Sequence, residues 1–381
     1  MRYRLEELFD LQMGKTPARA SPDYWNGSNK WVSISDLSGY DKYVTDTKEC
    51  ISDLGVSESG IKAVPKNTVI MSFKLSIGKT AITTEDIYTN EAIMAFIDKG
   101  VCEIDTDYLY YLFSGMDWNK GTNKAVLGLT LNKATLSKKE IDIPDLLTQN
   151  EVVKKLDSLS NVIQLQKQSL DKLDELVKSR FVEMFGDPKI NIYCFEKKNL
   201  KESCDIITGN TPSRANAEYY GNHIEWIKTD NILTNQLYPS QADEFLSVDG
   251  MNVGRYVDKG SILMSCIAGS LSSIGRVCIT DRKVAFNQQI NALVPKDYNV
   301  IFLYVLLLLS KDYLLEGINM ALKGILSKSG LGNKQLIIPP TDLQNQFADF
   351  VTKVEQQKST VQKSIDKLET LKKSLMQKYF G

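Results

Sequence analysis

The chain has 381 residues, 43% of them hydrophobic and 24% charged, which is enough for two or three globular domains that each bury a core. The formal net charge of −1 excludes a strongly basic protein, so any DNA contact must come from locally concentrated Lys and Arg. The longest apolar run, 300–309, is too short for a membrane span and the first residues do not form a signal peptide, so we expect a cytoplasmic protein.

Catalytic and cofactor motifs are missing from the sequence. The six cysteines form no Cys-x-x-Cys pair and His223 is the only histidine, so neither a zinc site nor a disulfide framework is predicted. A glycine-rich cofactor turn, a phosphate-binding lysine loop and a nuclease-like group of acids are also missing. We therefore predict that the chain is not an enzyme and holds no metal or cofactor.

The first 147 residues have the pattern of a mixed α+β body. Short apolar runs such as 67–73, bounded by polar turn residues, predict strands, whereas 108–114 predicts a short buried helix. Pro144 ends the last predicted strand. We place the first domain at 1–147.

Near the start of this body, Gly14 begins a Gly-x-Thr-Pro-x-Arg segment. The segment is either only a turn or a loop whose arginine contacts a DNA phosphate or a guanine edge, and the sequence leaves both readings open. Together with the cation that follows Gly78, the candidate DNA-binding residues here are Lys15, Thr16, Arg19 and Lys79.

Late in the body, residues 115–139 are rich in Lys, Asn and Thr and contain a single acidic residue. Such side chains on a loop suit phosphate contacts, and the alternative is a solvated loop with no partner. We take as candidates Lys120, Lys124 and Lys133.

A long helix is predicted next, at 149–186, because apolar residues recur at alternating spacings of four and three. A helix of roughly 37 residues would be about 55 Å long, longer than a small domain is wide. Thr148 marks the expected N-cap neighbourhood and Gly186 the C-cap, which gives a helical segment at 148–186. The predicted interface residues are Leu156, Leu159, Ile163, Leu170 and Leu173.

The second half of the chain repeats the first. After a short linker at 187–195, the Gly-x-Thr-Pro-x-Arg segment returns 195 positions later, at Gly209, and the strand and helix patterns return at 260–266, 275–280 and 301–310. We place this domain at 187–341. Its candidate DNA-binding residues are Thr211, Arg214, Arg276, Lys323 and Lys328.

The final segment, 342–381, repeats the long helix in the same register, over 344–381. An apolar stripe of this kind is often a core helix packed on its own domain. The length, the strict repeat and the duplication instead favour pairing of the two helices in a coiled coil. Its interface residues are Val351, Val354, Val361, Ile365 and Leu368.

Two Gly-x-Thr-Pro bodies that alternate with two long helices, and the phrase Ser-Arg-Phe-Val-Glu-Met-Phe-Gly-Asp at 179–187, resemble the specificity subunits of type I restriction-modification systems. The resemblance covers the whole chain. It implies an α+β fold in which two duplicated target-recognition domains are joined by two long helices that form an antiparallel coiled coil.

The resemblance also implies the partners. Each recognition domain would read one half of a bipartite double-stranded DNA target, and the coil would set the spacing and dock two modification subunits. S-adenosylmethionine would belong to those subunits, and ATP and Mg to the restriction subunits of the full complex. The competing readings are a coiled-coil scaffold without DNA specificity and a fusion that methylates or cuts DNA by itself, against which the missing cofactor motifs argue.

Overall fold

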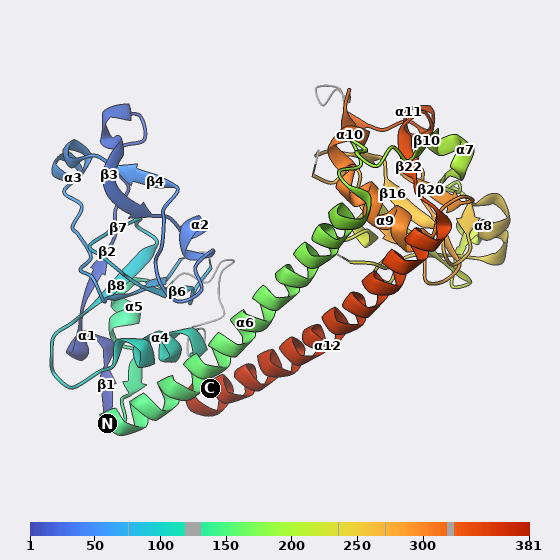
Figure 1. Cartoon of the computed structure of the whole chain (residues 1–381). Helices are drawn as coiled ribbons and strands as arrows, with labels where there is room; N and C mark the ends of the chain where they lie inside the picture. The colour runs from blue at the N-terminus through green and yellow to red at the C-terminus, as the bar shows by residue number, and fades with distance from the viewer. Residues whose placement is uncertain (75, 119–130, 235, 271, 318–323) are drawn as a thin grey trace. The chain divides into compact units, whose positions relative to one another are not determined.

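A computed structural model of the chain describes residues 1–74, 76–118, 131–234, 236–270, 272–317 and 324–381 (Figure 1). These residues form two compact units: unit 1 is Met1–Lys167 with Lys363–Gly381, and unit 2 is Gln168–Gln362. Within the described residues, no helix combines the length and the apolar character needed to cross a membrane.

The body of unit 1 is built on an antiparallel four-stranded sheet with the order β2-β8-β5-β6. A three-stranded sheet, β4-β3-β7, and the pair β1-β9 complete its described β-structure. In chain order the elements are β1 Arg2–Arg4, α1 Leu5–Leu8, β2 Phe9–Met13, η1 Pro22–Tyr24, β3 Trp25–Val32, α2 Ile34–Leu37, β4 Glu49–Ile51, α3 Asp53–Ser59, β5 Val69–Ser72, β6 Thr80–Ile82, β7 Tyr88–Thr89, β8 Ile93–Asp98, α4 Thr106–Gly115, α5 Lys133–Ser137 and β9 Glu140–Asp142.

The body of unit 2 repeats this plan with the four-stranded order β11-β20-β16-β18 and a larger sheet, β12-β14-β13-β19-β15. The pairs β10-β22 and β17-β21 accompany them. The elements are β10 Glu196–Asn199, α7 Leu200–Ser203, β11 Cys204–Thr208, η2 Ala217–Tyr219, β12 Tyr220–Gly221, β13 Ile224–Ile227, η3 Thr229–Asn231, β14 Phe245–Leu246, α8 Val248–Val253, β15 Tyr256–Val257, β16 Ile262–Ser265, β17 Ile267–Ala268, β18 Val277–Ile279, β19 Val284–Phe286, β20 Ile290–Pro295, α9 Val300–Leu309, α10 Lys311–Leu315, β21 Gly324–Ile325, α11 Lys328–Gly332 and β22 Gln335–Ile338.

One inner strand of each four-stranded sheet, β5 in unit 1 and β16 in unit 2, is buried on both faces, which explains its continuous apolar sequence. In β5, Val69 and Met71 belong to the core beneath α4, whereas Ile70 between them belongs to the core on the opposite face. In β16, Met264 and Leu263 divide in the same way between two cores. The predicted strands at 67–73, 260–266 and 275–280 and both short buried helices are therefore confirmed.

The two long helices have forty residues each, α6 from Leu146 to Phe185 and α12 from Thr341 to Phe380. Both begin a few residues before the predicted start. Asp145 accepts a hydrogen bond from the Thr148 amide at 2.9 Å, so the cap is Asp145 and not Thr148. The C-cap prediction is confirmed, because Gly186 has φ 70° and its amide reaches the Val182 oxygen at 2.8 Å.

The helices pair antiparallel in each unit. In unit 1, Val152 near the start of α6 shares a core with Phe380 at the end of α12. In unit 2, Lys358 bonds Asp174 at 2.8 Å, and Phe181 near the end of α6 packs on Phe347 near the start of α12. The predicted interface residues Leu156, Leu159, Ile163, Val351, Val354 and Ile365 are buried, and Leu170, Leu173, Val361 and Leu368 are half-buried.

A fully buried glutamine ties each long helix to its own body. Gln149 accepts a hydrogen bond from the Asp105 amide at 2.8 Å and donates to the oxygens of Glu103 and Pro144. Gln344, 195 positions later, makes the same three bonds in unit 2, to the Asn299 amide, Asp297 O and Pro339 O. Since a buried amide must be satisfied, this contact fixes the helix start against the body.

Candidate nucleic-acid interface

One end of the four-stranded sheet in unit 1 gathers several of the predicted DNA-binding residues. The register pairs Met13 with Met94 and Ser72 with Ile93, so β2 and β5 end where β8 begins. The loops that follow or precede these strands therefore lie together. We call residues 14–19, 73–74, 76–79 and 90–92 the loop end of unit 1, and it contains Lys15, Thr16, Arg19 and Lys79.

Unit 2 has the same arrangement. Thr208 pairs with Asn291 and Ser265 with Ile290, so β11 and β16 end where β20 begins. Residues 209–214, 266–270, 272–276 and 287–289 form the loop end of unit 2, which contains Thr211, Arg214 and Arg276. The structure thus brings together candidates that lie more than sixty positions apart in the sequence.

The first glycine of each Gly-x-Thr-Pro segment is required by a close backbone contact. A Cβ on Gly14 would lie 2.2 Å from the oxygen of Thr89, and a Cβ on Gly209 would lie 2.2 Å from the oxygen of Asn287. Any side chain would therefore push the loop away from the neighbouring turn. The glycine lets the loop run along the turn that begins β8 or β20.

In unit 1 the arginine of the segment is clamped by its own body. The Arg19 guanidinium forms an ion pair with Glu49, with Nη2 at 3.0 Å from Oε2, and its carbon lies 3.8 Å from the ring centre of Trp25. The Trp31 indole also donates to the Lys15 oxygen at 3.0 Å, which fastens the loop a second time. The loop is held rigidly, and half of the Arg19 side chain stays exposed.

The clamp recurs in unit 2 with each partner 195 positions later. Arg214 bonds Glu244 at 2.6 Å and lies 4.3 Å from the ring centre of Tyr220, and the Trp226 indole donates to the Asn210 oxygen. Hydrogen bonds from Lys228 and Arg214 hold the pKa of Glu244 below its ordinary value. Both arginines therefore fasten their loops, which supports the turn reading, and their contact with DNA stays a prediction.

The threonines and their neighbours are also held in place. The hydroxyl of Thr16 donates to Glu91 and that of Thr211 donates to Gln288, which occupies the equivalent turn. The Lys15 ammonium donates to the Ser59 oxygen. These contacts leave the loop surface polar and preorganised, as a DNA contact requires.

Two further cations at the loop ends each follow a glycine with a positive φ. Lys79 follows Gly78, whose φ is 87°, and its side chain is exposed. The half-buried Arg276 follows Gly275, whose φ is 74°, and donates to the Ser272 oxygen at 3.3 Å. Lys311, which sequence reasoning did not place at a site, also donates to the Ser272 oxygen, and burial lowers its pKa.

The structure describes only some of the lysines that were predicted to contact DNA late in each body. Lys133 and Lys328 are the exposed first residues of the equivalent helices α5 and α11. In unit 2 the chain leading to α11 lies beside the loop end, because the Leu326 amide donates to the Cys266 oxygen at 2.8 Å. Outside the described residues lie Lys120, Lys124 and Lys323.

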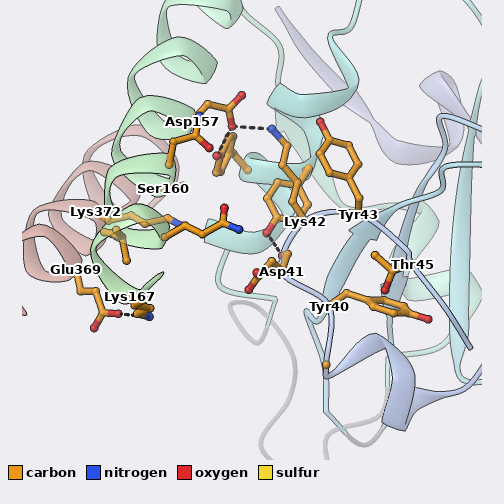
Figure 2. Close-up of a pocket in the computed structure, with 16 residues that line it drawn as sticks. Tyr40, Asp41, Lys42, Tyr43, Thr45, Asp157, Ser160, Lys167, Glu369 and Lys372 are labelled. Atoms are coloured by element: carbon orange, nitrogen blue, oxygen red, sulfur yellow. Dashed lines mark hydrogen bonds and ion pairs between the residues drawn. The ribbon is translucent and has the colours of Figure 1, made fainter. Parts of the chain in front are cut away.

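A polar cavity of about 730 Å³ lies in unit 1 where the loop 39–45 and α4 face the two helices. Lys42 pairs with Asp157 of α6 at 2.7 Å, and Lys167 pairs with Glu369 of α12. Figure 2 shows both pairs. Tyr111 donates to the same Asp157 carboxylate. Sequence reasoning missed this network, which fastens the unit 1 body to the helices. In the described residues, no cluster of acids, cysteines and histidine could hold a metal ion.

The family of the chain follows from comparison with known proteins. The model of the type I restriction modification DNA specificity domain matches residues 1–175 and again 194–370. Two adjacent copies thus cover most of the chain and coincide with its internal repeat. The chain belongs to the type I restriction-modification DNA specificity family.

Two curated proteins that are similar to the chain support this assignment. The type I restriction enzyme MjaIX specificity subunit of Methanocaldococcus jannaschii is 23% identical over 404 residues, which span 98% of this chain and 91% of that protein. The type I restriction enzyme HindI specificity subunit of Haemophilus influenzae is 38% identical over 105 residues, or 27% of this chain and 22% of that protein.

Two solved structures share the fold. One, from work on complex assembly and conformational transition of the type I R-M system, has a TM-score of 0.64 at 16% identity, covering 100% of this chain and 97% of the other. The S subunit from M. genitalium has a TM-score of 0.55 at 14% identity, covering 100% and 96%. The expected α+β fold, with two duplicated recognition domains and two long helices, is confirmed.

Proposed function

We propose that the chain is the non-catalytic specificity subunit of a type I restriction-modification complex and that each unit reads one half of a bipartite double-stranded DNA target. The observation that carries the proposal is the recurrence of the loop end in both units, with the same arginine clamp. The recognition domains are 1–147 and 187–341, and the spacer helices are 148–186 and 342–381.

Cations that recur at equivalent positions contact phosphates in this proposal. Two half-targets differ in sequence, whereas the DNA backbone is the same in both, so a contact that both units share carries no sequence information. The recurring pairs are Arg19 with Arg214, Lys79 with Arg276, and Lys133 with Lys328. Base reading then falls to residues that differ between the units.

The coil sets the distance between the half-targets and docks two modification subunits. Leu176 of α6 and Leu371 of α12 are equivalent in the repeat, and the two residues are 46% and 49% exposed. Because a large apolar side chain is exposed at equivalent positions on both helices, the helix pair offers similar docking positions to two copies of one partner.

The cofactors belong to the partners. The modification subunits bring S-adenosylmethionine and the restriction subunits bring ATP and Mg, while this chain selects the DNA sequence. Its relatives carry the name of specificity subunits, which agrees with this division of labour.

Selection from a random duplex library tests the proposal. The chain with its modification subunit should enrich two short sequences at a constant separation, whereas a scaffold without DNA specificity would enrich none. Methyl transfer from labelled S-adenosylmethionine to the selected DNA should need both proteins. Methylation by the purified chain alone would contradict the proposal.

A further inference from the structure

The helix pair carries an open apolar groove in unit 1. Its floor consists of Leu159 and Val162 of α6 with Leu368, Leu371 and Leu375 of α12, around a volume of about 580 Å³. Val162 is 42% exposed and Leu371 49%, so this apolar surface faces solvent in the chain by itself. We call these five residues the unit 1 groove.

The equivalent surface of unit 2 is different, although it lies on the same helices and in the same repeat. Its five residues, which we call the unit 2 face, are Val354, Gln357, Leu173, Leu176 and Arg180. Gln357 replaces Val162 and Arg180 replaces Leu375. The Arg180 guanidinium pairs with Glu183 at 2.8 Å and lies 5.9 Å from the ring centre of Phe350. Two of the five positions are thus polar.

The rims differ in charge as well. The unit 1 groove is bordered by Glu151, Lys154, Lys155 and Ser158, and Lys155 pairs with Glu151 at 3.6 Å, so Lys154 is the rim cation without that partner. The equivalent residues in unit 2 are Gln346, Asp349, Phe350 and Lys353, which place an acid where unit 1 has Lys154. A partner that places an acid opposite Lys154 would meet the like charge of Asp349 on the unit 2 face. One partner surface therefore cannot suit both faces equally.

We propose that the two docking faces of the coil are unequal, and that a modification subunit binds the unit 1 groove first and more tightly, through an apolar surface flanked by an acid. This inference rests on the proposed function. The intermediate of assembly is a complex of one modification subunit with this chain, occupied at unit 1. Since burying one more branched aliphatic side chain changes an affinity by about tenfold, the two dissociation constants should differ by at least about tenfold.

The test titrates the full chain with its modification subunit and resolves the one-to-one and two-to-one complexes by native mass spectrometry. Leu371→Asp and Leu176→Asp are matched variants at equivalent, exposed positions. Leu371→Asp should remove the tight site and leave the weak one, and Leu176→Asp should do the reverse. Thermal melting of both variants checks that the helices persist.

A gain-of-function variant keeps the inference falsifiable. Arg180→Leu with Gln357→Val gives the unit 2 face the apolar residues of the groove and should tighten the weak site about tenfold. Two equal dissociation constants for the unmodified chain, or loss of the weak site in Leu371→Asp, would overturn the inference while leaving the proposed function standing. Absence of any binding would overturn both. Dimerisation of the chain alone, abolished by Leu371→Asp, would assign the groove to a second copy and overturn it too.

Discussion

At the scale of residues, each buried glutamine at the start of a long helix forms hydrogen bonds with three backbone groups. Gln344 is fully buried, and replacing it by leucine would leave the Asn299 amide and two carbonyls without their partner. We expect Gln344→Leu to lower the free energy of unfolding of unit 2 by about 2–4 kcal/mol.

Urea unfolding and hydrogen exchange at the Asn299 amide would measure this destabilisation. The matched control is Gln346→Leu, two residues along the same helix and exposed, which should change stability by less than about 0.5 kcal/mol. Equal effects of the two substitutions would show that the buried amide does not anchor the helix.

Glu225 gives a pH-dependent prediction. Hydrogen bonds from the Arg282 guanidinium, both at 2.7 Å, hold the pKa of this carboxylate below its ordinary value. A depressed pKa stabilises the fold above the unfolded value near 4.3, and the contribution disappears as the pH falls through the folded pKa. Glu225→Gln should therefore destabilise unit 2 at pH 7 by about 1–3 kcal/mol, and this effect should shrink progressively as the pH falls below the unfolded value.

Thermal denaturation across this pH range would reveal the difference. Glu183→Gln is the control, because that carboxylate also pairs with an arginine but is 67% exposed, and exposed pairs contribute about 0–1 kcal/mol. A destabilisation by Glu225→Gln that does not shrink as the pH falls would mean that the ion pair is not its cause.

At the scale of elements, the internal repeat made the fold predictable where the same residue types recur in both halves. Contacts whose residue types differ between the halves could not be predicted from it. The Glu225–Arg282 pair has a counterpart in unit 1, the pair Lys30–Glu85 at 2.8 Å, with the charges exchanged. No comparison of residue identities would find it. The strands, short helices and coil were predictable because their apolar periodicity depends on local sequence alone.

The candidate site was predictable only in part. Glycine turns and recurring cations marked the loops, but the sheet register that gathers them joins residues far apart in the chain, such as Met13 and Met94. Glu49 and Glu244, the partners of the clamped arginines, lie 195 positions apart, so the repeat could have identified them. The network of Lys42 has no such signal, because its equivalent in unit 2 is Leu237.

Two cations of unit 1, Lys79 at the loop end and Lys133 at the start of α5, give a prediction about affinity. If Lys79 and Lys133 bind phosphates, replacing both by alanine should flatten the plot of log K against log salt by roughly 0.9 for each phosphate no longer neutralised, and it should leave the preferred sequence unchanged. Fluorescence anisotropy with the methyltransferase complex at several salt concentrations would measure the slope.

The control for this pair is Lys66→Ala. Lys66 precedes β5 and so lies towards the opposite end of the same sheet from Ser72. This variant should keep the slope of the unmodified chain. A change in the selected sequence on removal of the Lys79 side chain would instead assign that residue to base reading.

At the scale of the whole molecule, the proposed function and the continuity of the two long helices together predict that helix length sets the gap between the half-targets. Each helix runs through forty residues and passes from one unit to the other, with the boundary after Lys167 in α6 and after Gln362 in α12. A spacer built this way has no loop at the boundary that could absorb a change in length.

Lengthening both helices by one heptad should therefore widen the unread gap. Insertions after Ser169 and after Ser364, equivalent positions in the repeat, keep the apolar seam and add about 10 Å of helix rise. Since about ten base pairs cover about 34 Å, the gap should grow by at most about three base pairs. Each added pair also rotates the second half-target about the DNA axis, so affinity should fall.

Methylome sequencing of a strain that carries the double insertion would show the outcome. The same two half-sequences with a longer gap are expected. A matched variant with the heptad after Ser169 alone leaves seven residues of one helix without a partner and should lose activity, because the two helices are then out of register by one heptad beyond the insertion. Full activity with an unchanged gap in the double insertion would mean that the DNA or the recognition domains, and not the helices, determine the spacing.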